Sequence, residues 1–280
     1  PEPSVAVVAL DAASEGKLKP MPWPAETWRR ALSNLLSAGP RAVGLDVPDV
    51  RKAVDCNGSG VRQLAAVISG RPVVLAFAVQ DGAGDVATAP PALARYSCGA
   101  DGLPEPPTGR KCLQLPPDEV LTAAAGVGAI NVYPDLDGVA RAVPLLVGYD
   151  GRSYPSLVLE MARLAQGLPR GQGRLERPWV SLGQARYKVL PSAEMVVNFA
   201  GGYMQYQPVP FHSLLKMSPA DLQRSFGGRL VLIGPTDGSL APHLRTPVAP
   251  RLPGVELQAN ALGNLLRGDY FRPLPGWLSL

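Results

Sequence analysis

The strongest constraint on the fold is a pair of apolar runs that each end at an aspartate. The first is VAVVAL at 5–10, followed by Asp11, and the second covers 42–47 with Asp46 near its end. Continuous apolar runs of this length are typical of strands buried in a parallel sheet. Between them, residues 25–37 place apolar side chains at the i, i+4, i+7 and i+8 spacing of one helical face. The pattern predicts a β-α-β unit.

The rest of the chain alternates between helix and strand patterns that are separated by Gly and Pro. We expect helices at 59–69, 119–125, 156–166, 211–216 and 254–266, and strands at 73–79, 179–182, 187–190, 195–199 and 229–233. Segments 129–132 and 140–147 flank the turn PDLDG and predict a hairpin. The short strands between 179 and 199 are consistent with an antiparallel addition to the sheet. The predicted fold class is α/β: a single domain with a mixed central sheet flanked by helices.

Length and composition fit one elaborated domain. A chain of 280 residues with 46% apolar residues can bury a substantial core, and its 30 Gly and 31 Pro indicate much loop. We expect the domain to span 1–272. Residues 273–280 are apolar and include Trp277, and we interpret them as the start of a truncated juxtamembrane or transmembrane segment. No stretch reaches the roughly 20 apolar residues that a membrane helix needs.

Residues 80–117 are rich in Gly, Pro, Asp and Ala and predict an insertion. Cys98 and Cys112 bracket the sequence GADGLPEPPTGRK inside it, and we predict a disulfide between them that closes this loop and leaves Cys56 over. The alternative is two unpaired thiols in a cytosolic protein. Because there is no CxxC motif and the chain has only two histidines, we expect no metal site and no cofactor.

The charge of the chain argues against a nucleic-acid partner. The net charge is +4, but the Lys and Arg residues are scattered and form no run that could follow a phosphate backbone. A mildly positive surface fits proximity to anionic lipid as well as ordinary solvation.

Candidate ligand-binding residues follow from the predicted strands. Asp11, Asp46, Asn198 and Gly234 each lie at or just past the carboxyl end of a strand, where open α/β sheets usually bind ligands, so we expect them to converge on one crevice. The other candidate ligand-binding residues are Asn131, Asp135, Asp137, Thr236, His243 and Asn260.

Several of these candidates also have a structural explanation. Asp135 and Asp137 could offer carboxylates to a cation, but turn hydrogen bonds explain them equally well. Thr236 lies in GPTDGS, which lacks the Lys and spacing of a phosphate-binding loop and fits a tight turn. Asn260 sits among apolar residues of the last helix, where a packing role is the common one. GVGAIN, which ends at Asn131, precedes a strand, so it is not a dinucleotide fingerprint.

The order of the segments and several strings resemble the second class of CHASE domains. Near the start the strings are VAVVALD, MPWPAETWRRALSNLL and GPRAVGLDV; in the middle they are GAINVYPDLDGVARAVPL and YPSLVLEMA; near the end they are VVNFAGG, GRLVLIGPT and LPGVELQANALGNLL. The resemblance covers nearly the whole chain. The chain departs from the family in the cysteine-bearing loop and in GSLAPHLRTPV, where the family more often has an acidic residue near the place of His243.

The resemblance implies an extracytoplasmic sensing domain of a bacterial transmembrane receptor. Such a domain faces the periplasmic or extracellular side of the inner membrane, is bracketed by membrane helices that this chain lacks, and responds to a small-molecule or peptide ligand or to stress. The output would be an adenylate or diguanylate cyclase, a histidine kinase or a Ser/Thr kinase, which implies a homodimer in the full-length protein.

Two other functions remain open on the residues alone. The chain could be a solute-binding module without a signalling role, or a secreted hydrolase. We expect no enzyme activity, because there is no GxSxG motif and His212 and His243 lie in Pro-flanked loops without an obvious carboxylate partner.

Overall fold

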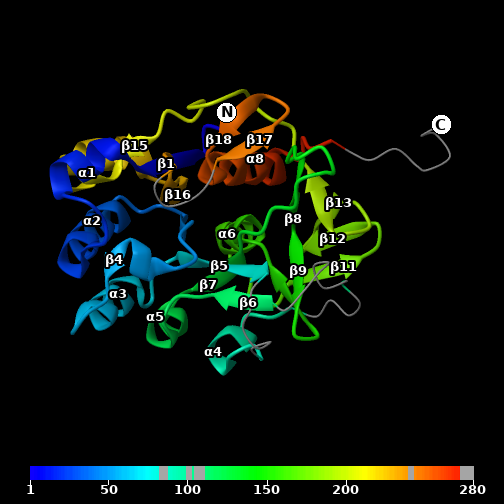
Figure 1. The fold of residues 1–280 in the computed structure, drawn as a ribbon, viewed down its shortest axis with the longest axis horizontal. Helices are drawn as coiled ribbons and strands as arrows, with labels where there is room; N and C mark the ends of the chain where they lie inside the picture. The colour runs from blue at the N-terminus through cyan, green and yellow to red at the C-terminus, as the bar shows by residue number, and fades with distance from the viewer. Residues whose placement is uncertain (82–87, 99–102, 104–110, 239–242, 272–280) are drawn as a thin grey trace.

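The computed structural model of this chain describes residues 1–81, 88–98, 103, 111–238 and 243–271. Within this part a seven-stranded sheet has the order β15-β1-β16-β3-β5-β6, with β7 also paired to β5 (Figure 1). All pairs in it are parallel except β5–β6. The predicted mixed sheet is confirmed. Its strands are β1 (Val5–Leu10), β3 (Ala42–Leu45), β5 (Val73–Asp81), β6 (Lys111–Gln114), β7 (Gly126–Ala129), β15 (Val209–Pro210) and β16 (Leu230–Pro235).

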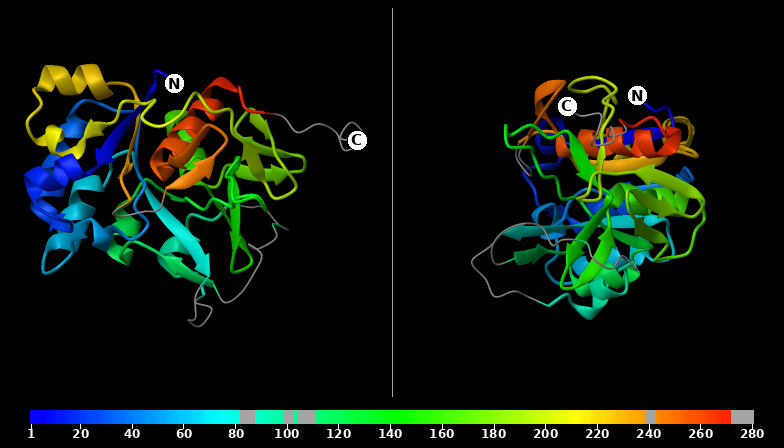
Figure 2. Two further views of the ribbon diagram at one scale, coloured as in Figure 1. Left: turned by 45° about the horizontal axis from the view of Figure 1, so that its top comes forward. Right: turned by 90° about the vertical axis from the view of Figure 1, so that its right-hand side faces the viewer.

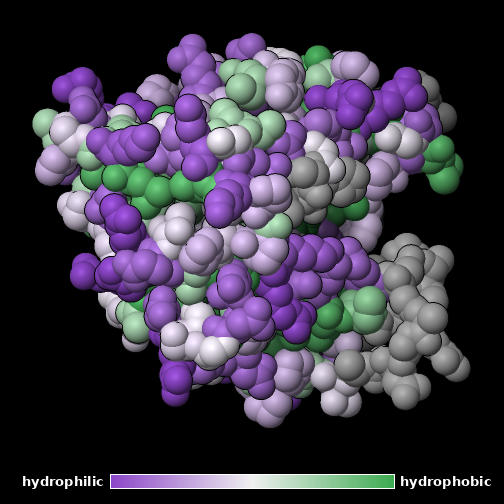
Figure 3. Space-filling view, turned by 60° about the vertical axis from the view of Figure 1, so that its left-hand side comes forward, coloured by the Kyte–Doolittle hydropathy of each residue, from purple (hydrophilic) through white to green (hydrophobic). Residues whose placement is uncertain are grey.

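Helices cover both faces of the sheet. Successive side chains of a strand point to opposite faces, and in this sheet the side chains on both faces are apolar. In β1, Val8 and Leu10 pack into one core cluster and Val5 and Val7 into another. The first face carries α1 (Ala12–Leu18), α2 (Ala25–Ser37), α3 (Gly60–Ile68), α5 (Asp118–Ala123), the 3-10 helix η2 (Phe211–Leu215) and α7 (Pro219–Phe226). The second carries α6 (Leu157–Ala165) and α8 (Gly254–Arg267). Hydrophilic residues cover much of the outer surface on the side of Figure 3.

The shorter strands form small sheets of their own, so their predicted addition to the central sheet is wrong. β11 (Gly173–Glu176), β12 (Trp179–Leu182) and β13 (Ala185–Lys188) make one antiparallel sheet. Two-stranded sheets pair β8 (Ala142–Pro144) with β14 (Glu194–Val196), β9 (Leu146–Tyr149) with β10 (Arg152–Pro155), β17 (Leu244–Thr246) with β18 (Ala249–Leu252), and β2 (Trp23–Pro24) with β4 (Val54–Asp55). The short helices α4 (Pro91–Ala94) and η1 (Val50–Lys52) complete the described elements.

The predicted hairpin around PDLDG is also wrong. The strand before this turn, β7, pairs in parallel with β5, and the strand after it, β8, pairs with β14. Every residue of β7 is buried, which suits the interior of a parallel sheet better than a hairpin arm. The turn itself forms, with the Gly138 N–H donating to the Asp135 carbonyl at 2.8 Å.

The predicted disulfide is absent: Cys56, Cys98 and Cys112 are all unpaired. Each of the two bracketing cysteines is held by a different strand. The Cys98 N–H donates to the Ser153 carbonyl of β10 at 2.8 Å, whereas Cys112 lies in β6 opposite Gln80. Burial raises the pKa of the Cys98 thiol to about 12. Most of the loop between the two cysteines, and the predicted juxtamembrane segment 273–280, lie outside the described residues.

The glycines of GVGA let α6 pack directly on the sheet. A Cβ on Gly128 would lie 2.5 Å from the backbone nitrogen of Leu157, where α6 begins. One on Gly126 would lie 2.6 Å from Glu160 in the same helix. These contacts give the GxG spacing a packing role and not a nucleotide-binding one.

The last helix meets the start of the chain. Arg267, at the end of α8, makes an ion pair with Glu2 at 2.9 Å, and a Cβ on Gly263 would approach Glu2 to 3.0 Å. Both views in Figure 2 place the first residues beside this helix. At its other end α8 begins at the carboxyl edge of the sheet, so one helix joins that edge to the N-terminus.

Candidate functional site

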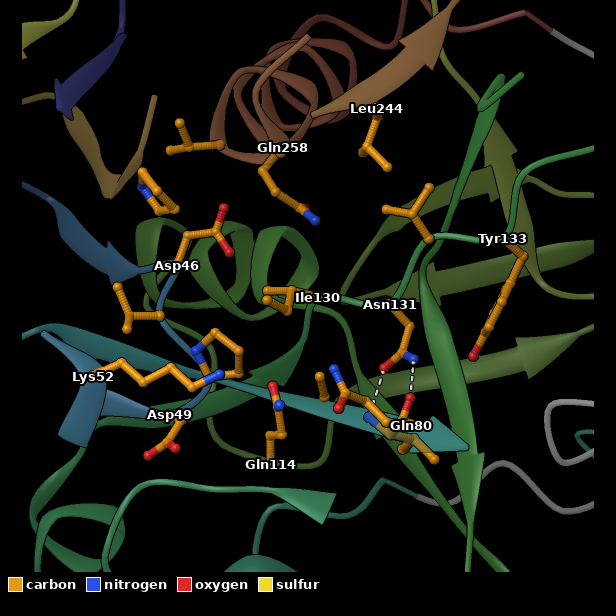
Figure 4. Close-up of a pocket in the computed structure, with 18 residues that line it drawn as sticks. Asp46, Asp49, Lys52, Gln80, Gln114, Ile130, Asn131, Tyr133, Leu244 and Gln258 are labelled. Carbon is orange, nitrogen blue, oxygen red and sulfur yellow. Dashed lines mark hydrogen bonds between the residues drawn. The ribbon is translucent and has the colours of Figure 1, made fainter. Parts of the chain in front are cut away.

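A cavity of about 460 Å³ lies at the carboxyl ends of β3, β5, β7 and β16 (Figure 4). Open α/β sheets bind ligands at this edge, and the volume suits a small molecule. The first turns of α8 form one wall, and the loop that follows β3 forms another. The polar and charged side chains along the cavity are Asp46, Asp49, Lys52, Gln80, Gln114, Asn131, Tyr133 and Gln258.

Asp46 is the most unusual residue of the cavity. Asp46 comes directly after β3 and is only 6% exposed. Its backbone N–H donates to the Ile233 carbonyl at 2.8 Å. Within the described residues its carboxyl group makes no hydrogen bond or ion pair. Burial raises its pKa from 3.8 to about 7. Because one pKa unit corresponds to about 1.4 kcal/mol, the ionised form is disfavoured by about 4 kcal/mol.

The backbone of β16 makes room for Asp46. A Cβ on Gly234 would lie 3.0 Å from the Asp46 Cβ and 2.9 Å from Val255 of α8. A glycine at this position therefore allows β16, the loop after β3 and α8 to meet closely. The close approach fixes the wall of the cavity in which the carboxyl group stands.

Gln258 faces Asp46 from α8. Figure 4 shows both side chains directed into the cavity from neighbouring walls. Gln258 is only 3% exposed, and its Oε1 has no hydrogen-bond partner in the part of the chain that the structure describes. A buried polar atom without a partner costs roughly 1 to 3 kcal/mol, which a bound ligand can recover.

The mouth of the cavity is more polar and more exposed than the inner part around Asp46 and Gln258. Asp49 accepts from Arg51 Nε at 2.8 Å, and the neighbouring Lys52 is exposed and makes no ion pair within the described ranges. Gln80 and Gln114 come from the antiparallel pair β5–β6. Thus β6, the antiparallel strand of the sheet, extends the cavity beyond the end of β3.

Asn131 continues the pairing of β7 with β5 through its side chain. Its Oδ1 accepts from the Val79 N–H at 3.1 Å, and its Nδ2 donates to the Val79 carbonyl at 2.7 Å (Figure 4). The amide thus replaces a backbone partner where β7 has ended, and it holds the loop before Tyr133 against the cavity.

A family profile described as "CHASE2 domain" matches residues 1–280, the whole chain. The chain belongs to the CHASE2 family. CHASE2 domains are extracellular or periplasmic sensory domains of cyclase- and kinase-type receptors and are not catalytic. The searches of curated proteins and of solved structures gave no match. None of the helices in the described part of the chain combines the length and the apolar character of a membrane span.

Of the sequence-based candidates, this CHASE2 domain brings Asp46 and Asn131 to the cavity. Asp11 follows β1 but caps α1, where its Oδ1 accepts from the Ser14 N–H at 2.8 Å. Thr236 and His243 lie next to each other beyond β16, with His243 Nε2 3.2 Å from the Thr236 carbonyl. Neither of these two lines the described wall of the cavity.

The other four candidates of the CHASE2 domain have partners elsewhere. Asp135 and Asp137 form exposed ion pairs with Arg141 at 2.7 and 2.8 Å. Asn198 donates to the Asp269 carbonyl at 2.9 Å, and Asn260 accepts from the Ala200 N–H at 2.8 Å. The contacts of Asn198 and Asn260 attach the segment after β14 to α8 and to the residues that follow it.

Sequence reasoning missed several polar residues of the cavity. Gln80 follows the apolar run of β5 just as Asp46 follows that of β3, so its position was a readable signal. Gln258 lies in LQANAL two residues before Asn260. The packing of α8 directs Gln258 to the cavity and Asn260 to Ala200, and the sequence alone does not distinguish them. Gln114 and Lys52 come from segments whose placement depends on the tertiary fold.

Within the residues that the structure describes, a serine and a histidine of the CHASE2 domain lie side by side. His212 Nδ1 lies 3.3 Å from Ser14 Oγ, and the His212 N–H donates to the same hydroxyl at 3.2 Å. Ser14 is fully buried. The pair therefore fastens α1 to η2 and does not present a nucleophile to a substrate.

Proposed function

We propose that this CHASE2 domain is the extracytoplasmic part of a bacterial transmembrane receptor and that a small molecule in the cavity at the carboxyl edge of the sheet controls its output. The observation that supports this proposal is the buried Asp46 carboxyl group, which has no hydrogen bond or ion pair in the described chain and stands beside the unpartnered Gln258 Oε1 on the neighbouring wall. The ligand would compensate polar groups that the fold leaves unsatisfied.

Signalling requires two arrangements of the domain with different affinities for the ligand. The cavity lies between α8, the β3 loop and the β5–β6 pair, which come from three distant parts of the chain. A ligand that contacts all three would change their relative positions. We propose that attached membrane helices carry this change to a cyclase or kinase output, and that the full-length receptor works as a homodimer.

A cavity-filling substitution tests the role of the cavity. Gln80 is exposed at the rim, so Gln80→Trp would place an indole in the cavity without disturbing the core, and Gln184→Trp, in the β12–β13 turn, is the matched control. Small metabolites that raise the unfolding temperature of the wild type and of Gln184→Trp, but not of Gln80→Trp, bind in the cavity. Each is then added to membranes that contain the intact receptor, and its output activity is measured.

We expect a cavity ligand to change the output activity and Gln80→Trp to abolish that change. A ligand that binds in the cavity but leaves the output unchanged would favour a solute-binding module without a signalling role. A reporter fused within the domain of the intact receptor should be active outside the cytoplasm. Activity only in the cytoplasm would contradict the proposed location.

A further inference from the structure

The inner part of the cavity holds hydrogen-bond acceptors that have no partner within the described chain, and the donor beside them, the Gln258 Nε2 amide, is uncharged. Asp46 is 6% exposed and Gln258 is 3% exposed. Among the described residues, the Gln258 Oε1 has no hydrogen-bond partner, and the Asp46 carboxyl group receives no hydrogen bond or ion pair. The Asn131 amide is held by two hydrogen bonds to the backbone of Val79.

Charge is unbalanced in the same way. Among the described lining residues the charged groups besides Asp46 are Asp49 and Lys52, both on the loop and 3-10 helix that follow β3. Asp49 pairs with Arg51 and Lys52 is exposed at the mouth. The residues that face Asp46 from β16 and α8 are the uncharged Gly234, Pro235, Val255 and Gln258. No described residue supplies a counter-charge to the buried carboxylate.

We propose that the ligand of this cavity is a small organic molecule with a primary ammonium group, and that the ammonium group donates hydrogen bonds to Asp46. This inference rests on the proposed role of the cavity as the sensing site. An ammonium group brings a positive charge and three N–H donors, enough for the carboxylate and for a neighbouring amide oxygen. Val47, Ile130 and Val255 offer apolar contact to the carbon chain of the ligand.

Other ligand classes fit less well. A neutral polyol would bring donors but leave the charge of the carboxylate uncompensated, and an anion would be repelled by it. A bare metal ion would need several oxygen ligands, and the described residues contain no group of three or more His, Cys, Asp and Glu that could hold one.

Binding of an ammonium ion should depend on pH through Asp46. Burial raises the pKa of this carboxyl group to about 7, so at lower pH the proton must leave before the cation can bind. The ionised fraction is about 1% near pH 5 and about half near pH 7, which predicts an affinity about 50-fold higher near pH 7.

The probes are 1-aminobutane, its neutral isostere 1-butanol, and butanoate, each at constant ionic strength set with sodium chloride. Binding to the purified domain is followed by NMR shift changes and by the unfolding temperature, for the wild type and for Asp46→Asn. Asp118→Asn, an exposed site on α5, removes the same charge outside the cavity and is the control. We expect 1-aminobutane to bind the wild type and Asp118→Asn at least about 10-fold more tightly than Asp46→Asn, with the pH dependence above.

Three results would overturn the ammonium inference: equal binding of the amine and the alcohol, equal binding of the amine to Asp46→Asn, or no binding of the amine at all. Each of them leaves the cavity open to another ligand class. The proposed function fails separately, when no metabolite distinguishes the wild type from Gln80→Trp or when a cavity ligand does not change the output of the intact receptor.

Discussion

Replacing Asp46 with Asn should remove a pH dependence of stability that the wild type carries. The amide has nearly the shape of the protonated carboxyl group but cannot ionise. Well below the unfolded-state pKa of 3.8, the wild-type carboxyl group is protonated in both the folded and unfolded states, so it contributes no penalty. Between about pH 4 and pH 7 the unfolded chain releases the proton while the folded protein retains it, and the free energy of unfolding falls by about 1.4 kcal/mol per pH unit.

The total loss follows from the size of the pKa shift. From 3.8 to about 7 is about three units, or about 4 kcal/mol, complete once the pH has passed the folded-state value. A domain of this size is commonly stable by 5 to 15 kcal/mol, roughly speaking, so the effect is a large fraction of the total.

Urea unfolding followed by circular dichroism between about pH 4 and pH 7 measures this difference. The free energy of unfolding of Asp46→Asn minus that of the wild type should rise by about 3 kcal/mol over this range. Asp118→Asn should follow the wild type, because its side chain is exposed. Other buried acids, such as Glu160 and Glu256, are present in all three proteins and cancel in the difference. A difference that stays flat with pH would refute the argument.

Three further predictions test the packing and the cysteines. Gly128→Ala should lower the free energy of unfolding by about 2 to 3 kcal/mol in chemical denaturation, because its Cβ meets the rigid backbone where α6 begins; a change near zero would mean that α6 is not seated there. Arg163→Met should cost about 3 to 5 kcal/mol in the same assay, since it leaves the buried Glu160 without its 2.8 Å partner; a neutral result would contradict the buried ion pair. Thiol titration of the denatured, unreduced protein should find all three cysteines free, and a single free thiol would restore the disulfide.

Sequence patterns were sufficient to place a helix or strand where the spacing of its apolar residues matches the surface that it buries. The helix predicted at 25–37 has the same bounds in the structure, and Val5–Leu10 is a strand in full, because each has one unambiguous pattern and a clear end. Pairing was harder to predict. Adjacent strands in the chain suggested a hairpin around PDLDG, but the burial of β7 on both faces places it in the parallel sheet, and burial is a property of the fold.

The candidate site was predictable to the extent that it follows strand ends. Asp46 and Asn131 come directly after or close to β3 and β7, and the parallel sheet brings these ends together. Asp11 has the same position after β1, yet its side chain caps a helix that sequence periodicity did not reveal. Gln258 and Lys52 reach the cavity only because α8 and η1 pack at its wall, which no local pattern encodes.

The ion pair between Glu2 and Arg267 connects α8 mechanically to the first residues of the chain. The 14 residues of α8 form a stiff rod about 21 Å long, with Gln258 and Val255 near one end and the anchor to the first residues at the other. A small tilt forced on this helix by a bound molecule would move Arg267, and the ion pair would move Glu2 with it in the same direction. Residue 2 and residue 267 would then shift as one unit, so binding at the carboxyl edge of the sheet would be felt on the opposite side of the domain.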